Sequence, residues 1–195
     1  MKINSIALFC GSADGNSPKY TELAQSFGTR CASLNRTLYY GGASVGLMRA
    51  AAKACHDAGG KIVGIAPDFF SKGTVLDTSL QELHLVRTMS ERKQKFEILA
   101  DAFVALPGSY GTMDELFEAL TNAQLGLHQK PVALLNAFGY YDHLILLLKH
   151  FHQEGFLKDF HLDLLIIAST IDELFDKLSS YTYNNDRHWL SKIKK

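Results

Sequence analysis

The chain has 195 residues, of which 47% are hydrophobic and 21% are charged. This length and composition fit one globular domain with its own core and exclude a disordered chain. Twenty basic residues balance twenty acidic ones, so neither nucleic acid nor a membrane surface is expected as a partner. A small anionic ligand remains compatible with this balance, because it needs only a few local donors.

The N-terminal segment and the cysteines predict a cytoplasmic protein. The segment MKINSIALFCGS has one lysine and an apolar run, but the run is short and ends in a glycine turn, so we interpret it as a core strand. The apolar run at 144–148 is far too short to cross a bilayer. Cys10, Cys31 and Cys55 form no CxxC pair, which argues against a disulfide framework or a zinc site and fits a reducing compartment.

Short apolar runs alternate with longer stretches of helical periodicity. Predicted strands cover residues 5–10, 37–40, 61–66, 102–106, 131–136 and 164–169, with 83–87 as a candidate further strand. Predicted helices cover residues 18–35, 46–58, 90–100, 112–127, 140–154 and 170–180. Continuous apolar runs are typical of strands covered on both faces. The alternation therefore predicts an α/β fold with a doubly wound parallel sheet.

The domain is predicted to span residues 1–181, followed by a polar and basic tail at 182–195. No linker or internal repeat divides the sequence, so we expect a single domain. The last predicted helix opens with Thr170 and Glu173 in the spacing of a capping box.

Three glycine-bearing turns follow predicted strands and lead into predicted helices. They are CGSADGN at 10–16, GGASVG at 41–46 and PGSYGT at 107–112. Ligands bind at the carboxyl ends of parallel strands, and the free N–H groups at a helix start favour an anion. None of the turns is a Walker A loop or a GxGxxG motif. Together they predict a phosphate or nucleotide site, with Gly11, Gly42 and Gly108 lining one cleft.

The role of Glu115 has two interpretations at this level. Thr112 and Glu115 have the spacing of a capping box, in which the carboxylate only closes a helix start. The same carboxylate would lie at the predicted ligand edge, where it could act on a bound molecule. Asp114 needs no further explanation than the helix dipole, which favours an acidic residue in the first turn.

Arg92 and Lys93 follow Ser90, which resembles a helix N-cap, and cations in a first turn oppose the helix dipole. One interpretation is a solvated basic face that includes Lys95. The other is that Arg92 faces an anion or a carboxylate at the ligand edge, a role that suits its planar fork of donors.

Other polar residues give weaker signals. Ser12 and Ser109 lack the GxSxG pattern of a nucleophile, so we expect both to hydrogen-bond phosphate. The eight histidines show no HExxH or other metal-ligand spacing. We therefore predict no metal site.

Two motifs carry a resemblance to a known family. Residues 89–93 (MSERK) and 101–115 (DAFVALPGSYGTMDE) closely resemble the MxxRK and PGGxGTxxE motifs of the LOG ("lonely guy") family. That family comprises cytokinin riboside 5′-monophosphate phosphoribohydrolases, long mislabelled as lysine decarboxylases. The similarity extends to residues 10–20, 39–48, 59–67, 124–142 and 154–156, so it covers most of the chain.

The resemblance implies a Rossmann-like fold, a homodimer and an enzyme without a cofactor. The implied reaction is hydrolysis of the N-glycosidic bond of an adenine-type nucleoside 5′-monophosphate, N6-prenylated in cytokinins, to the free base and ribose 5-phosphate. Two alternatives stay open: an AMP nucleosidase that takes a plain purine, and a non-catalytic carrier of a nucleotide or cofactor on the same fold. A carrier needs no carboxylate beside the ribose, so the presence of both Arg92 and Glu115 favours the enzyme.

The family's essential residues fall on Arg92 and Glu115. The candidate contacts to phosphate and nucleotide are Gly11, Ser12, Gly41, Gly42, Met89, Lys93, Gly108, Ser109, Tyr110, Gly111 and Thr112. The chain departs from the family pattern at Ser109, which replaces the second glycine of PGG, and at Ala43 and Arg49. If the backbone at that second glycine needs a positive φ, Ser109 is strained.

The implied chemistry builds positive charge on the ribose in an oxocarbenium-like transition state. Glu115 would stabilise that charge, orient ribose hydroxyls or activate water. Arg92 would anchor the nucleotide or position Glu115. For the implied homodimer, the apolar stretch at 140–151 is a candidate interface, although the same residues could equally belong to the core.

Overall fold

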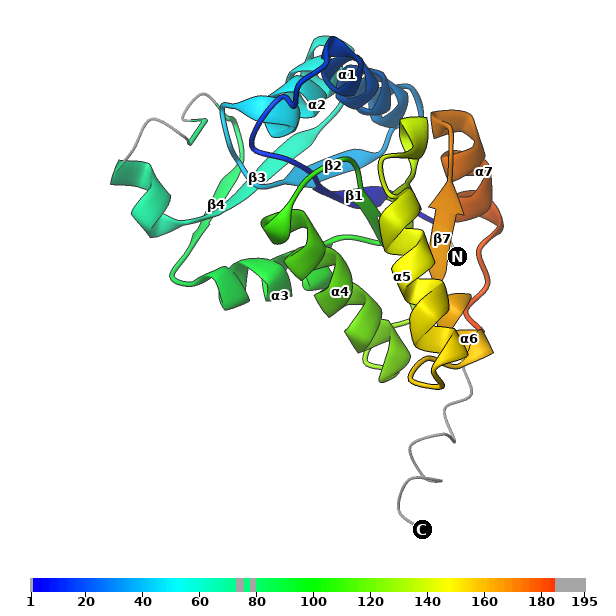
Figure 1. Cartoon of the computed structure of the whole chain (residues 1–195). Coiled ribbons are helices and arrows are strands. Elements are labelled where there is room, and N and C mark those ends of the chain that lie inside the picture. The colour runs from blue at the N-terminus through cyan, green and yellow to red at the C-terminus, as the bar shows by residue number, and fades with distance from the viewer. Residues whose placement is uncertain (1, 73–75, 78–79, 185–195) are drawn as a thin grey trace.

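The computed structural model describes residues 2–72, 76–77 and 80–184 of the chain. Most of the predicted tail, from residue 185 onward, lies outside the described residues. Within them the strands form one seven-stranded sheet in the order β4-β3-β2-β1-β5-β6-β7, and every pairing is parallel (Figure 1). The strands are β1 (Ser5–Phe9), β2 (Thr37–Tyr40), β3 (Ile62–Pro67), β4 (Leu83–Val86), β5 (Ala102–Ala105), β6 (Val132–Leu135) and β7 (Leu165–Ala168). The predicted strands, including the candidate at 83–87, are confirmed.

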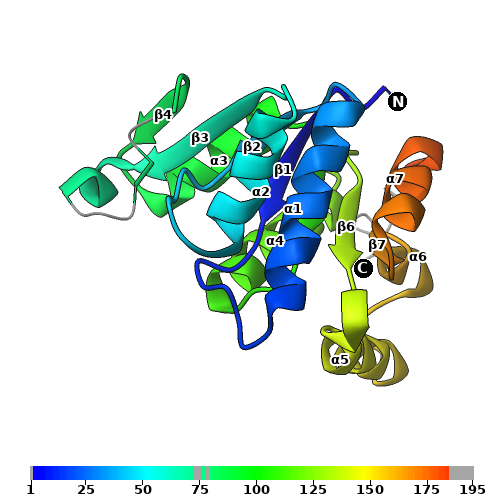
Figure 2. The ribbon, with the colours of Figure 1, turned by 90° about the horizontal axis from the view of Figure 1, so that it is seen from above.

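Helices cover both faces of the sheet, as Figure 2 shows from above. The main helices are α1 (Pro18–Ser33), α2 (Gly46–Asp57), α3 (Met89–Leu99), α4 (Tyr110–Gln124), α5 (Asp142–Gln153) and α7 (Ile171–Ser180). They confirm the six predicted helices. The sequence did not predict the short elements η1 (Asp68–Lys72), η2 (Ala137–Gly139) and α6 (Asp159–Leu162). They have five, three and four residues, too few to leave a clear hydrophobic period.

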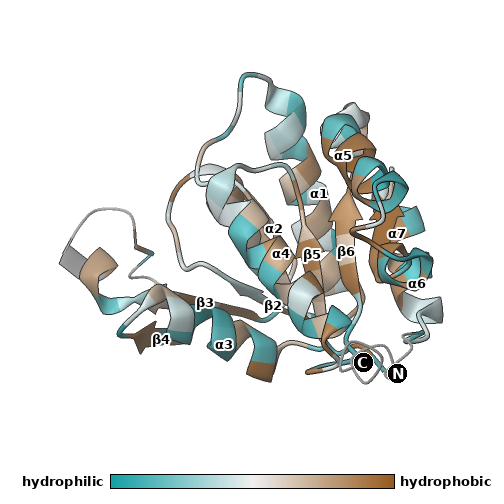
Figure 3. Cartoon of the chain, turned by 60° about the horizontal axis from the view of Figure 1, so that its bottom comes forward, coloured by the Kyte–Doolittle hydropathy of each residue, from teal (hydrophilic) through white to brown (hydrophobic). Residues whose placement is uncertain are grey.

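The alternation of side chains along β1 divides the core between the two faces. Ile6 and Leu8 belong to the cluster that includes residues of α1, α2 and α7. Ala7 and Phe9 belong to the cluster that includes residues of α3, α4 and α5. Figure 3 shows the strands as mostly apolar and the surrounding helices as a mixture of hydrophobic and hydrophilic residues. The doubly wound arrangement explains why the strand sequences are continuously apolar.

The direction in which successive strands are added to the sheet reverses at β1. From β1 the chain proceeds outward through β2, β3 and β4, then crosses back to add β5, β6 and β7 on the other side of β1. Such a switch point opens a crevice at the carboxyl ends of the two central strands. The N–H of Gly11, after β1, donates to the carbonyl of Pro107, after β5, at 3.0 Å. This bond joins two of the three glycine turns at the predicted edge.

Two helix starts differ from the prediction. The N-cap of α3 is Thr88, not Ser90, and the Thr88 side chain accepts from the N–H of Glu91 at 3.1 Å. Helix α4 begins at Tyr110, with Ser109 as its N-cap, so Thr112 and Glu115 lie inside the helix and form no capping box. The capping interpretation of Glu115 is therefore wrong. The capping box of α7 is confirmed, because Thr170 accepts from the N–H of Glu173 at 3.2 Å.

Gly28 allows α1 and α2 to approach closely. A Cβ atom on Gly28 would lie 2.0 Å from the carbonyl oxygen of Ala51 in α2. That oxygen is helix backbone, so it cannot move aside without shifting α2. The close approach matters for the site, because α2 follows the second glycine turn.

We predict that Gly28→Ala destabilises the protein by about 1–3 kcal/mol, as overpacking typically does. Helix propensity alone would predict the opposite, since alanine is the better helix former. Ser26→Ala at an exposed position of the same helix serves as the matched control and should leave stability unchanged or slightly raise it. Urea unfolding of the two variants measures both effects. A Gly28→Ala protein as stable as wild type would contradict the close-approach argument.

Candidate active site

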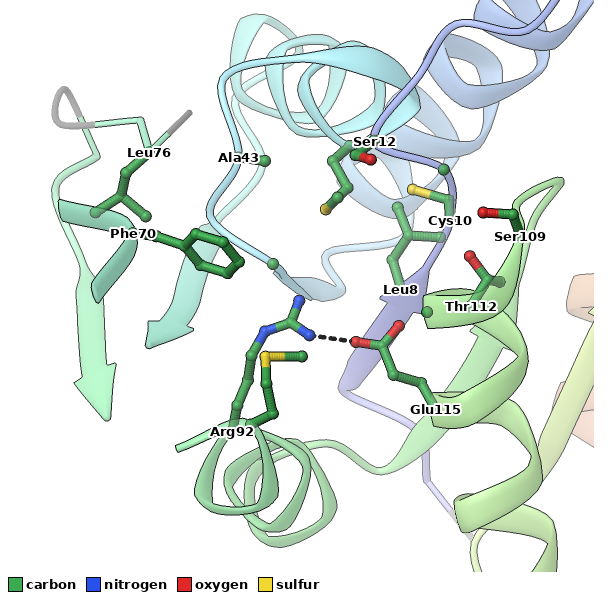
Figure 4. Close-up of a pocket in the computed structure, with 15 residues that line it drawn as sticks. Leu8, Cys10, Ser12, Ala43, Phe70, Leu76, Arg92, Ser109, Thr112 and Glu115 are labelled. Carbon is green, nitrogen blue, oxygen red and sulfur yellow. Dashed lines mark hydrogen bonds and ion pairs between the residues drawn. The ribbon is translucent and has the colours of Figure 1, made fainter. Parts of the chain in front are cut away.

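A cavity of about 250 Å³ lies at the carboxyl ends of the central strands. Its two sides differ in character (Figure 4). On one side, called the polar side below, Ser12, Ser109 and Thr112 bring hydroxyl groups to a wall that also contains Leu8 and Cys10. Ala43, Phe70 and Leu76 lie on the other, apolar side. Met48 and Met89 also line the cavity. Arg92 and Glu115 lie where the two sides meet, so the cavity combines a polar end, an apolar end and a charged pair.

The charged pair is buried and tightly held. Arg92 Nη1 lies 2.5 Å from Glu115 Oε1, and the two residues are only 7% and 8% exposed. Arg92 Nε also donates to the carbonyl of Ile65 in β3 at 2.9 Å. The guanidinium carbon lies 5.1 Å from the centre of the Phe96 ring, within the range of a cation–π contact. These contacts fix the direction from which Arg92 meets the carboxylate.

Gly41 provides the space that the Arg92 side chain occupies. A Cβ atom at this position would lie 2.3 Å from Arg92 Nη2 and 2.7 Å from the Met48 sulfur. The second glycine turn therefore contributes room for the guanidinium as well as backbone to the cavity.

Burial governs the ionisation of Glu115. It raises the pKa of the Glu115 carboxyl above its ordinary value, while the charge and hydrogen bond of Arg92 act in the opposite direction. Arg92 thus offsets part of the effect of burial, and the net shift of the Glu115 pKa is upward. Burial, followed by the charge of Glu115, also raises the pKa of the Cys10 thiol. Cys10 is consequently a neutral thiol in the cavity wall and a poor nucleophile.

The third glycine turn presents hydroxyl groups at the polar side. Ser109 has φ −124° and makes no side-chain capping hydrogen bond. The negative φ removes the possible strain considered for serine at this position. The neighbouring position requires glycine, because a Cβ atom on Gly108 would lie 2.0 Å from Thr112 Oγ1. The hydroxyls of Ser109 and Thr112 thus line a cavity at the start of α4, where the helix dipole favours an anion.

Most of the predicted site residues meet in this cavity. Those that line it are Gly11, Ser12, Gly41, Met89, Arg92, Ser109, Gly111, Thr112 and Glu115. Four others, Gly42, Lys93, Gly108 and Tyr110, belong to the same turns and helices but do not line it. Lys93 pairs instead with Asp114 at 3.0 Å and Glu118 at 2.5 Å, joining α3 to α4. Tyr110 is 93% exposed.

The sequence missed the apolar side of the cavity. Phe70 comes from η1, Leu76 from an isolated bridge to Ala43, and Met48 from the first turn of α2. These residues share no motif and are scattered over separate elements. Chain folding alone brings them together, so no local pattern could have identified them.

Within the described ranges, no group of three or more histidine, cysteine or acidic residues is placed to hold a metal ion. None of the helices described is long and apolar enough to span a membrane.

The chain is similar in sequence to known proteins. The family profile described as "Possible lysine decarboxylase" matches residues 48–178. Cytokinin riboside 5′-monophosphate phosphoribohydrolase LOG3 of Arabidopsis thaliana is 39% identical over 186 residues, which cover 95% of this chain and 86% of that protein. The probable phosphoribohydrolase LOGL3 of Oryza sativa subsp. japonica is 38% identical, over 92% of this chain and 85% of its own length.

Solved structures share the fold at lower identity. The protein TM1055 aligns with a TM-score of 0.71 and 20% identity over 92% of this chain and 100% of that one. The molybdenum cofactor binding protein of Rippkaea orientalis aligns with a TM-score of 0.68 and 22% identity, over 92% of this chain and 98% of its own. At these identities the likeness concerns the fold alone.

We predict that Arg92→Met raises the pKa of Glu115 further, because it removes a neighbouring positive charge that stabilises the carboxylate. Lys93→Met is the matched control. Lys93 also lowers the pKa of Glu115, but its influence is smaller than that of Arg92. A ¹³C NMR titration of the Glu115 carboxyl carbon in the wild type and both variants measures the pKa of Glu115, which should be highest in Arg92→Met. An equal or larger shift in Lys93→Met would contradict the assigned role of Arg92.

Proposed function

The chain belongs to the LOG family of cytokinin riboside 5′-monophosphate phosphoribohydrolases, and we propose from this membership which bond it cleaves and with which residues. It is a hydrolase acting on N-glycosyl bonds, and its substrate is an adenine-type nucleoside 5′-monophosphate. The products are the free base and ribose 5-phosphate. The observation that carries the proposal is the buried Arg92–Glu115 pair between a polar and an apolar side of one cavity.

The two sides of the cavity match the two ends of such a substrate. The 5′-phosphate binds at the polar side, where Ser12, Ser109 and Thr112 offer hydroxyls and α4 begins. The base lies against the apolar side, which includes Phe70 and Leu76. The ribose then lies between them and close to Glu115.

Glu115 acts when the bond between base and ribose breaks. The base leaves with the bonding electrons, and positive charge develops at the anomeric carbon and ring oxygen of the ribose. The ionised carboxylate stabilises this charge in a site shielded from bulk water. Water then adds its oxygen to the anomeric carbon, and its protons are shared between the new hydroxyl group and the departing base.

Arg92 acts through Glu115. It holds one carboxylate oxygen, and its positive charge opposes the rise in the pKa of Glu115 that burial causes. We therefore assign Arg92 the positioning role rather than the anchoring role. The predicted contact residues outside the cavity lining support its shape: Gly108 and Gly42 in the turns, and Lys93 in the link between α3 and α4.

The apolar side of the cavity favours an N6-prenylated base over plain adenine, because a prenyl group needs apolar surface to leave water. Incubating the protein with AMP and with isopentenyladenosine monophosphate, and following base release by chromatography, tests this choice. Faster release from the prenylated substrate would support the proposal. Faster release from AMP would identify an AMP nucleosidase, and release from neither would favour the carrier alternative.

We predict that Glu115→Gln lowers the rate of base release about 10²–10³-fold, as removal of comparable electrostatic stabilisation does. The variant keeps the size of the side chain but loses its charge. Asp114→Asn is the matched control. Asp114 lies one residue earlier and pairs with Lys93 outside the cavity lining, so this variant should keep most activity. Thermal melting of both variants shows that they fold. A Glu115→Gln enzyme with near wild-type turnover would remove the main residue from the mechanism.

We further propose a cytoplasmic homodimer. The three cysteines are free and buried, as suits a reducing compartment. Helix α5 divides its apolar residues: Leu148 packs in the core, whereas Leu146 and Leu147 are 59% and 45% exposed. The exposed pair supports an interface on α5.

Light scattering at micromolar concentration should give the mass of a dimer, and Leu147→Asp should shift it toward the monomer. Ile98→Asp, which changes an exposed apolar residue of α3, is the matched control and should leave the dimer intact. A wild-type monomer would contradict the dimer, and a dimer broken only by Ile98→Asp would exclude α5 as its interface.

A further inference from the structure

The segment that leads from β5 into the third glycine turn has three successive carbonyl groups, each held by a donor from elsewhere in the chain. The donors come from the first glycine turn and from the start of α5. The three hydrogen bonds are Tyr141 Oη to Leu106 O at 2.7 Å, Gly11 N to Pro107 O at 3.0 Å, and Tyr140 Oη to Gly108 O at 2.8 Å. The path of the turn is thus fixed from two sides.

The turn before α5 is shaped to bring the two tyrosines there. Phe138 has φ 60° and Gly139 has φ 70°, so two consecutive residues are left-handed. This conformation is uncommon for a bulky residue and persists only where its surroundings enforce it. Asn136 contributes to that enforcement, because its side chain accepts from the N–H of Tyr141 at 2.7 Å and donates to Asp142 at 2.8 Å.

The two tyrosine bonds differ in consequence. In a trans peptide the C=O and the following N–H point in opposite directions. Tyr141 holds the carbonyl of Leu106, but the next residue is Pro107, which has no N–H to orient. Tyr140 holds the carbonyl of Gly108, and the next residue is Ser109, which has an N–H and lines the cavity. The carbonyl of Gly108 points to Tyr140, so the N–H of Ser109 faces away from Tyr140.

We propose that Tyr140 is a positioning residue for phosphate binding, which locks the Gly108–Ser109 peptide with its N–H toward the 5′-phosphate and its carbonyl away from it. This inference rests on the proposed function, because it assigns the occupant of the polar side. Gly108 has no side chain to resist rotation of the adjacent peptide. A rotated peptide would exchange a donor for a carbonyl acceptor beside an anion. The Tyr140 hydroxyl stabilises the productive orientation by holding that carbonyl.

Tyr140→Phe, which removes the hydroxyl alone, tests the lock. The KM for the nucleoside monophosphate should rise about tenfold, in line with a weakened hydrogen bond to a charged group. The kcat should change by no more than about twofold, because the interaction is made equally in the ground state and the transition state. Inorganic phosphate, titrated by calorimetry in the absence of substrate, should bind more weakly by the same factor.

Tyr141→Phe is the matched control, since it removes a hydroxyl from the neighbouring residue and leaves the carbonyl of Gly108 held by Tyr140. It should lower the melting temperature but leave KM and phosphate affinity unchanged. Tyr183→Phe removes a hydroxyl that donates to the carbonyl of Ala123 at 2.9 Å, at the far end of α4. It should also leave both constants unchanged. Equal KM values for Tyr140→Phe and wild type would overturn the proposal, as would an equal rise in Tyr141→Phe.

The outcomes separate this inference from the proposed function. If the wild type hydrolyses no nucleoside monophosphate but binds phosphate more tightly than Tyr140→Phe does, the result contradicts the proposed function and supports the positioning role of Tyr140. If the wild type hydrolyses its substrate and Tyr140→Phe binds phosphate as tightly as the wild type does, the result contradicts the positioning role of Tyr140 and supports the proposed function. If the wild type does not bind phosphate, the lock is overturned.

Discussion

The buried ion pair between Arg92 and Glu115 is the constraint on which the rest of the site depends. Taking two charges out of water costs several kcal/mol per ion, and only close geometry with additional hydrogen bonds offsets that cost. The fold supplies both, since Arg92 also donates to the carbonyl of Ile65 and lies near the Phe96 ring. It also needs a residue without a side chain at Gly41, where a Cβ atom would meet the guanidinium. A pair that demands so much of its surroundings contributes little net stability, so the catalytic role that we propose for Glu115 explains it better than stability does.

The sheet order explains how residues distant in the sequence surround this pair. Strands β2, β1 and β5 are neighbours, so the three turns that follow them meet at one edge although long segments of chain separate them. The bond from the Gly11 N–H to the Pro107 carbonyl ties two of these turns together. Helices α3 and α4 bring Arg92 and Glu115 to this edge, and Lys93 joins those helices through Asp114 and Glu118. The position of the carboxylate is thus set by the sheet and by both helices, which favours a fixed geometry during the reaction.

The sequence could predict much of the fold, because strands covered on both faces are continuously apolar and stand out from amphipathic helices. It could predict the three turns for the same reason, since each follows such a strand. It could not decide between capping and chemistry for Glu115. The spacing from Thr112 imitates a capping box, and only the earlier start of α4 at Tyr110 removes that interpretation. Phe70 and Leu76 were beyond prediction, because a short 3₁₀ helix and an isolated bridge carry no periodic signal. Ser109 departs from the glycine of the family motif, yet its negative φ shows that the backbone accepts a side chain there.

The division of the cavity also bears on selectivity. For the substrate that we propose, with an anion at one end and an apolar group at the other, only one orientation matches both sides, and in it the middle of the substrate lies beside Glu115, where the two sides meet. A ligand that lacks the anion loses the hydroxyls and the helix start at the polar side, so nothing fixes its distance from the carboxylate. A ligand that lacks the apolar group leaves the surface near Phe70 and Leu76 in contact with water, which weakens the shielding that makes the carboxylate effective. In the proposed reaction both ends therefore serve the same step: the anionic end fixes the position of the bond to be broken, and the apolar end excludes the solvent that would screen the charge beside it.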